Sequence, residues 1–162
     1  MSEKIETGSE QQIKRDLKRS FPHDEFFRSS EGREKLERVL HAFAKYETKV
    51  GYVQGMNFIA GSLLYHCNEE VVFWLIVTLM EDHELREVYQ PGLSGLYKHC
   101  QCIESLVEER LPHISEHFKD CGLQVEMYAS DWIFGMYCSI IPLDKLAEFW
   151  TNFFERGWAF FY

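Results

Sequence analysis

The sequence predicts an all-α protein, and three observations support this fold class. Apolar side chains recur at helical spacing, the alternating patterns typical of strands are scarce, and single glycines and prolines separate the periodic segments. The 162 residues are 46% apolar and 15% aromatic, enough hydrophobic surface for a core with large rings wedged between helices. We therefore expect one compact helical domain.

The polar and acidic residues 1–10 are expected to form a disordered lead-in to this domain. A helix then carries Ile13 and Leu17 on one side. It is expected to stop just before Pro22, because the residue that precedes a proline disfavours helical dihedral angles. This boundary places Arg19 in the last turn of the helix.

Residues from about 30 to 49 form the next expected helix, since their apolar side chains lie on one stripe. Ser29 or Ser30 can serve as its N-cap and Gly51 as its C-cap. The other helices are expected at about 55–66, from Asn68 to a break at Pro91-Gly92, and at about 93–111, 112–122, 125–140 and 142–162.

Charge and composition exclude several classes of protein. The formal net charge is −9, whereas proteins that bind nucleic acid present a basic face to the phosphates, so we expect no nucleic-acid partner. The longest apolar run, residues 71–80, is too short to cross a bilayer, and the polar N-terminus shows no secretory signal. We expect a cytoplasmic protein without a membrane span, whose five scattered cysteines are free thiols.

Arg19 is the first candidate catalytic residue. It follows Asp16 by three positions, so both side chains lie on one helix face and the carboxylate can hold the guanidinium. A guanidinium can neutralise the charge that develops on a transferring phosphoryl group. The same spacing is also typical of a solvated helix face opposite the apolar Ile13 and Leu17.

Gln54 is the second candidate, and it lies between Gly51 and Gly55. Glycines permit unusual dihedral angles and close approach of the backbone to a partner. The glutamine amide can accept a hydrogen bond from an attacking water while it donates one to a phosphate oxygen. Tyr52 is expected to support this loop. The alternative is an ordinary turn with Tyr52 in the core and Gln54 on the surface.

Together and in this order, the two segments resemble the IxxDxxR and YxQ motifs of the TBC domain family, the GTPase-activating proteins for Rab small GTPases. The residues that carry the first match, with the three that follow it, are Ile13, Asp16, Arg19 and Ser20-Phe21-Pro22. The second match is Gly51-Tyr52-Val53-Gln54-Gly55-Met56-Asn57. Weaker similarity continues through residues 130–137, 141–143 and 149–154, so the resemblance covers about residues 11–162.

The resemblance implies an all-helical domain whose groove receives a GTP-bound Rab. In the family an arginine acts as a finger in trans and a glutamine replaces the water-orienting glutamine of the GTPase. By match these are Arg19 and Gln54, with Asp16 and Tyr52 as supporting residues. It also implies a GTPase activator with no reaction and no cofactor of its own, because the partner carries GTP and Mg²⁺, and recruitment to membranes in vesicle trafficking through the Rab.

The family pattern includes a tryptophan-containing segment before the arginine motif and further helices beyond the last one here. We therefore expect a partial TBC domain over residues 11–162, truncated at both ends. The sequence does not indicate which Rab it acts on.

Two other hypotheses stay open. The first is a catalytically silent helical domain that binds a Rab or serves as a scaffold. The second is a zinc hydrolase, since His113, Glu116 and His117 fit the H-x-x-E-H pattern of inverted zinc metallopeptidases. The pattern is short and has no third ligand, so a polar surface helix that begins at Pro112 is the simpler interpretation.

Overall fold

The computed structural model describes residues 8–162, and this range contains eleven α-helices, one short 3₁₀-helix and no strand. The predicted all-α class is confirmed. Residues 1–7 of the expected lead-in lie outside the described residues, whereas residues 8–10 form the first turn of helix α1.

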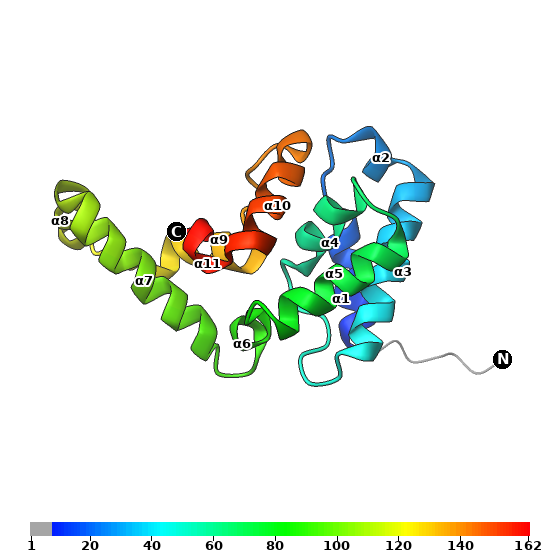
Figure 1. Ribbon diagram of the computed structural model, residues 1–162, viewed down its shortest axis with the longest axis horizontal. Helices are drawn as coiled ribbons and strands as arrows, with labels where there is room; N and C mark the ends of the chain where they lie inside the picture. The colour runs from blue at the N-terminus through cyan, green and yellow to red at the C-terminus, as the bar shows by residue number, and fades with distance from the viewer. Residues whose placement is uncertain (1–7) are drawn as a thin grey trace.

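Five helices build the N-terminal half (Figure 1). They are α1 (Gly8–Leu17), α2 (Glu25–Arg28), α3 (Ser30–Tyr46), α4 (Met56–Leu64) and α5 (Glu69–Glu81). Helix α3 packs against the other four, and Ile13, Leu36 and Leu40 at its contacts are fully buried. This apolar centre follows from the helical spacing of the residues that form it.

The remaining helices form the C-terminal half. They are α6 (Leu85–Tyr89), α7 (Ser94–Arg110), α8 (Pro112–Asp120), α9 (Glu126–Gly135), the 3₁₀-helix η1 (Leu143–Lys145), α10 (Leu146–Arg156) and α11 (Trp158–Phe161). Helix α7 extends away from the N-terminal half as an arm with α8 at its far end (Figure 1). Helix α9 contacts both α7 and α4, so it connects the two halves.

Several helix starts agree with the sequence prediction. The Ser29 hydroxyl accepts the N–H of Gly32 at the start of α3, and the Asn68 side chain accepts the N–H of Val71 at the start of α5. Pro112 occupies the first turn of α8, where its missing N–H costs no hydrogen bond. Local capping chemistry therefore predicted these boundaries correctly.

Several predicted helix ends are wrong. The segment from Asn68 to Pro91 contains two helices, α5 and α6, and the helix predicted at about 125–140 ends at Gly135. Helix α1 ends at Leu17, so Arg19 lies in the turn beyond it, because the chain leaves the helix to reach Phe21 at φ +46°. Helix α3 ends at Tyr46, and Gly51 lies in the following loop instead of capping the helix. The last predicted helix is broken at Gly157, whose φ of +60° separates α10 from α11.

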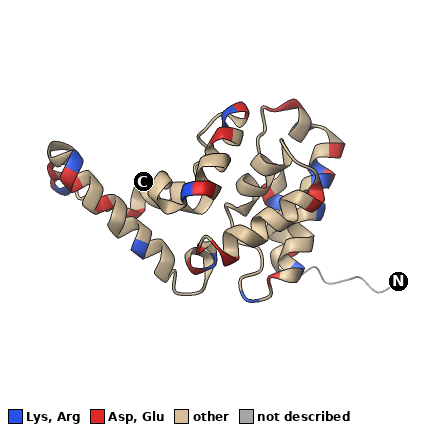
Figure 2. Cartoon of the chain, viewed as in Figure 1, with Lys and Arg blue, Asp and Glu red and all other residues tan. Residues whose placement is uncertain are grey.

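Charged residues of both signs are interspersed over the helices of both halves (Figure 2). Among the helices of residues 8–162, none combines the length and the apolar composition needed to cross a bilayer.

Candidate functional site

Arg19 is held at one edge by Asp16. Its Nε lies 3.0 Å and its Nη2 2.9 Å from Oδ1 of the Asp16 carboxylate. The side chain of Asp16 is 6% exposed, whereas that of Arg19 is 46% exposed. The buried carboxylate therefore orients the guanidinium, while nearly half of the arginine side chain stays accessible to a ligand.

Tyr52 fixes the same carboxylate from the other side. Its hydroxyl donates a hydrogen bond of 2.7 Å to Oδ2 of Asp16, and the tyrosine is itself buried. Burial, and then the hydrogen bond to the Asp16 carboxylate, raise the pKa of Tyr52. The phenol stays protonated as a donor. The structure thus brings three sequence-predicted residues, Asp16, Arg19 and Tyr52, into one contact group.

The loop that carries Gln54 depends on its glycines. Gly51 and Gly55 adopt φ values of +67° and +106°, which side chains rarely tolerate. A Cβ atom on Gly55 would lie 2.6 Å from the carbonyl oxygen of Phe134 in α9. Gln54 itself is exposed, and its amide makes no hydrogen bond to another described residue. The loop therefore presents a free amide from a backbone that lies tightly against α9.

Arg19 and Gln54 line the same pocket, although they lie far apart in the sequence. This pocket has a volume of about 370 Å³, within the usual range for ligand sites. Its other lining residues come from the glutamine loop, from α4 and from the region of α9: Val53, Gly55, Phe58, Ser130, Asp131, Phe134, Gly135 and Ser139. The arrangement places a cationic group, a neutral amide and the carboxylate of Asp131 on one cavity, and the first two groups are suited to an anion and a water molecule.

Two buried polar residues of the site were not predicted from the sequence. The Ser20 hydroxyl donates to the carbonyl oxygen of Asp16 at 2.8 Å, and Nδ2 of Asn57 donates to the Ser20 hydroxyl at 2.8 Å. The backbone N–H of Gly55 donates to Oδ1 of Asn57 at 3.2 Å. Both residues stand inside the segments that carry the motifs, and the available signal was a polar amide at the start of the mostly apolar α4.

The α9 residues of the pocket were also missed as site residues. The periodicity of this segment predicts a helix, but it does not indicate that Ser130 and Asp131 face Arg19 across a cavity. That juxtaposition depends on how α9 docks on α4.

The residues of the zinc hypothesis do not form a metal site. His113, Glu116 and His117 are all exposed on α8. The sulfur of Cys121 lies 3.7 Å from Nε2 of His117, and two such groups are too few for a zinc site. In the part of the chain that the structure describes, no three His, Cys, Asp or Glu side chains are grouped to hold a metal ion. The polar surface helix is the interpretation that fits.

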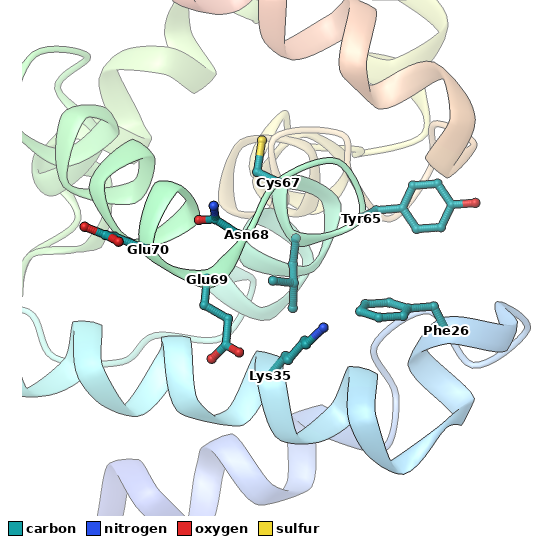
Figure 3. A pocket seen from close by; sticks show the side chains of 8 residues that line it. Phe26, Lys35, Tyr65, Cys67, Asn68, Glu69 and Glu70 are labelled. Carbon is teal, nitrogen blue, oxygen red and sulfur yellow. The ribbon is translucent and has the colours of Figure 1, made fainter.

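A second pocket, of about 520 Å³, opens where α2 and α3 meet the ends of α4 and α5 (Figure 3). None of the sequence-predicted site residues lines it. Two of its three charged groups already have partners, since Lys35 pairs with Glu31 and Glu69 forms two hydrogen bonds with Arg38. The pocket of Arg19 and Gln54 is therefore the better candidate for chemistry.

Comparison with known proteins gives relatives over nearly the whole chain. The "Ecotropic viral integration site 5 ortholog" of Drosophila melanogaster is 33% identical over 161 residues, 98% of this chain and 20% of that protein. The "Rab GTPase-activating protein eat-17" of Caenorhabditis elegans is 35% identical over 94% of this chain and 17% of its own length. The chain thus spans about a fifth of these relatives.

The fold is also similar to solved structures. The Chlamydomonas flagellar RabGAP TBC domain superposes with a TM-score of 0.81 at 30% identity, over 96% of this chain and 52% of that one. The Ypt/Rab-GAP domain of Gyp1p, at 18% identity and a TM-score of 0.76 over 90% of this chain and 53% of that one, shares the fold. The family model RabGAP-TBC, described as Rab-GTPase-TBC domain, matches residues 1–162. The chain therefore belongs to the RabGAP-TBC family.

Proposed function

We propose that this domain is a GTPase-activating protein for a Rab-family small GTPase in its GTP-bound form, and that Arg19 and Gln54 enter the partner's nucleotide site in trans. One observation gives the main support for this proposal. Two groups 35 positions apart line one pocket, and one of them is anchored by a buried carboxylate.

Each residue has a separate role in this mechanism. The exposed part of the Arg19 guanidinium approaches the transferring phosphoryl group and neutralises charge that builds up in the transition state. The Gln54 amide accepts a hydrogen bond from the attacking water and so orients it. GTP and Mg²⁺ belong to the partner, and the domain has no separate reaction of its own. The encounter takes place in the cytoplasm, at the membrane to which the Rab recruits the domain.

Asp16 and Tyr52 act on Arg19 and not on the nucleotide. A long arginine side chain loses substantial rotamer freedom when it is placed, and an anchor supplies part of that ordering before the partner arrives. An arginine finger contributes about 10³ to 10⁵ in rate, so most of the activity is expected to depend on this residue.

The test is single-turnover GTP hydrolysis by a panel of GTP-loaded Rabs, with the wild type and with the Arg19→Ala and Gln54→Ala variants. Arg15→Ala is the matched control, because Arg15 is an exposed arginine of α1 that does not line the pocket. We expect the wild type and the control to accelerate hydrolysis by at least one Rab, and both site variants to lose most of that acceleration.

Two outcomes would contradict the proposal. If the wild type accelerates no Rab, the domain is not an activator. Binding of GTP-loaded Rab without acceleration would instead identify a catalytically silent Rab-binding domain.

A further inference from the structure

We propose that Ser20 and Asn57 are positioning residues that hold the Arg19 turn and the Gln54 loop at a fixed separation. Neither side chain lines the pocket. The inference rests on the proposed function, because it assigns to these residues the alignment of the two groups that would act on the nucleotide.

A continuous series of hydrogen bonds joins the two loops. It runs from the carbonyl of Asp16 through the Ser20 hydroxyl and the Asn57 amide to the backbone N–H of Gly55. Ser20 directly follows Arg19, and Gly55 directly follows Gln54. The series therefore ends next to each of the two groups.

Burial makes these bonds difficult to replace with water. Asn57 is 0% exposed and Ser20 is 2% exposed. A buried amide without partners costs free energy, so the Asn57 side chain is stable here only while both of its ends are bonded. Its two ends serve different loops: Oδ1 serves the glutamine loop and Nδ2 serves the arginine turn. Any relative shift of the loops breaks at least one of these bonds.

The arginine turn needs such a connection because it is not part of a helix. Helix α1 ends at Leu17, and Phe21 adopts φ +46°. The carbonyl of Asp16 accepts the backbone N–H of Arg19 at 3.1 Å, and the hydrogen bond from Ser20 is a second one that links this turn to Asn57. Since a displacement of about 1 Å in a catalytic group can cost about 100-fold in rate, a fixed separation has a direct effect on activity.

The experiment compares Ser20→Ala with Ser62→Ala. Ser62 is an equally buried serine outside the pocket, and its hydroxyl accepts from Nε1 of Trp150 at 2.9 Å and donates to the carbonyl of Ile59 at 2.8 Å. Ser20 likewise accepts one side-chain N–H and donates to one carbonyl. The Ser62 hydroxyl has one further contact, at 3.3 Å to the sulfur of Cys138, so Ser62→Ala should cost at least as much stability as Ser20→Ala.

Two readouts separate positioning from stability. Amide hydrogen exchange over residues 51–57 should become faster in Ser20→Ala and stay unchanged in Ser62→Ala, because only the first variant releases Asn57. Single-turnover assays with a GTP-loaded Rab should show a saturating rate about 10- to 100-fold lower in Ser20→Ala. The half-saturating concentration should stay within about threefold, because the docking surface is intact. Ser20→Thr, which keeps the hydroxyl, should recover a large part of the rate.

The outcomes distinguish this inference from the proposed function. If the wild type activates no Rab, the proposed function fails, and with it the effect of Ser20 and Asn57 on activity. Unchanged exchange in Ser20→Ala would show in addition that the two loops are not joined. If the wild type is active and the two alanine variants lose rate equally, only the positioning role is overturned. Faster exchange with a selective loss of the saturating rate in Ser20→Ala supports it.

Discussion

The hydroxyl of Tyr52 lies 2.7 Å from Oδ2 of Asp16, although the two residues are 36 positions apart in the chain. The other carboxylate oxygen, Oδ1, is the one that holds Arg19. Each oxygen therefore has a separate partner. The buried tyrosine and the exposed arginine thus fix the orientation of the carboxylate together, and four variants test this and three related features of the structure.

Tyr52→Phe removes the hydroxyl and leaves Oδ2 of Asp16 buried without its donor. We expect a loss of about 1–3 kcal/mol in the free energy of unfolding, measured by chemical denaturation. GTPase activation should also fall, because the anchor of Arg19 is loosened. Tyr97→Phe is the control, since Tyr97 is half exposed, and it should change stability by less than about 0.5 kcal/mol. Equal effects of the two variants would contradict the role given to Tyr52.

Gly55→Ala tests the close approach of the glutamine loop to α9. Gly92→Ala is a matched control, because Gly92 has a similar φ of +94° but a Cβ atom there meets nothing within 4 Å. The control should cost about 1–2 kcal/mol from backbone strain alone. At Gly55 the added methyl group also collides with the carbonyl of Phe134, so the loss should exceed the control by about 1–3 kcal/mol. Thermal and chemical unfolding measure the loss of stability in both variants. Similar losses would show that the close approach of Gly55 to Phe134 does not limit the side chain at position 55.

Arg86→Met tests the ion pair that ties the loop after α3 to α6. Burial alone would raise the pKa of Glu47, but hydrogen bonds, first of all from Arg86, outweigh it and lower that pKa. The Glu47 side chain is 5% exposed and lies 2.7 Å from Nη2 of Arg86, so removing the arginine should cost about 3–5 kcal/mol. Lys98→Met breaks the exposed pair with Glu84 and should cost about 0–1 kcal/mol in the same denaturation assay. A cost for Arg86→Met as small as that of the control would contradict this account.

His99→Gln tests a buried imidazole that stacks on Trp158 and bonds the hydroxyl of Tyr162. Burial, with a smaller effect of Lys98 that Glu84 opposes, lowers the pKa of His99 from 6.5 to about 4. Between these values the unfolded chain binds more protons than the folded one, so this contribution to stability is complete above pH 6.5 and is lost as the pH falls toward 4.

The measurement is the difference in unfolding free energy between pH 7 and pH 5 for each protein. His99→Gln should lose less stability on acidification than the wild type, whereas His113→Gln, at an exposed histidine of α8, should behave as the wild type does. An unchanged pH dependence in His99→Gln would show that the imidazole does not titrate in this way.

The sequence predicted those features that depend on neighbouring residues. Ser29 and Asn68 cap their helices as their side-chain chemistry indicates, and the pairing of Asp16 with Arg19 follows from a spacing of three. Contacts between segments that are distant in the sequence were harder to predict. The end of α1 depends on Ser20, whose hydroxyl is engaged by Asn57 from another helix, and no local pattern contains that bond.

The sequence could not predict the pocket wall formed by α9, for the same reason. Helical periodicity shows which residues of α9 face inward, but it does not show which element they pack against. That packing depends on Gly55, which has no side chain and so allows the backbone of Phe134 to lie close to it. The motif chemistry therefore indicated the two groups that share the pocket, whereas the residues that complete the pocket depend on how the helices pack.

The peptide carbonyl of Phe134 has one neighbour from each half of the chain. The hydroxyl of Tyr89 donates to it at 2.8 Å, and Gly55 faces it without a side chain in between. The Gln54 loop thus packs against α9 of the second half, whereas the residues that anchor Arg19 all belong to the first half. If α9 undocks in a partial unfolding event, the pocket loses its α9 wall, while the bonds from Tyr52 to Asp16 and from Asn57 to Ser20 stay within the first half and still hold the two loops together.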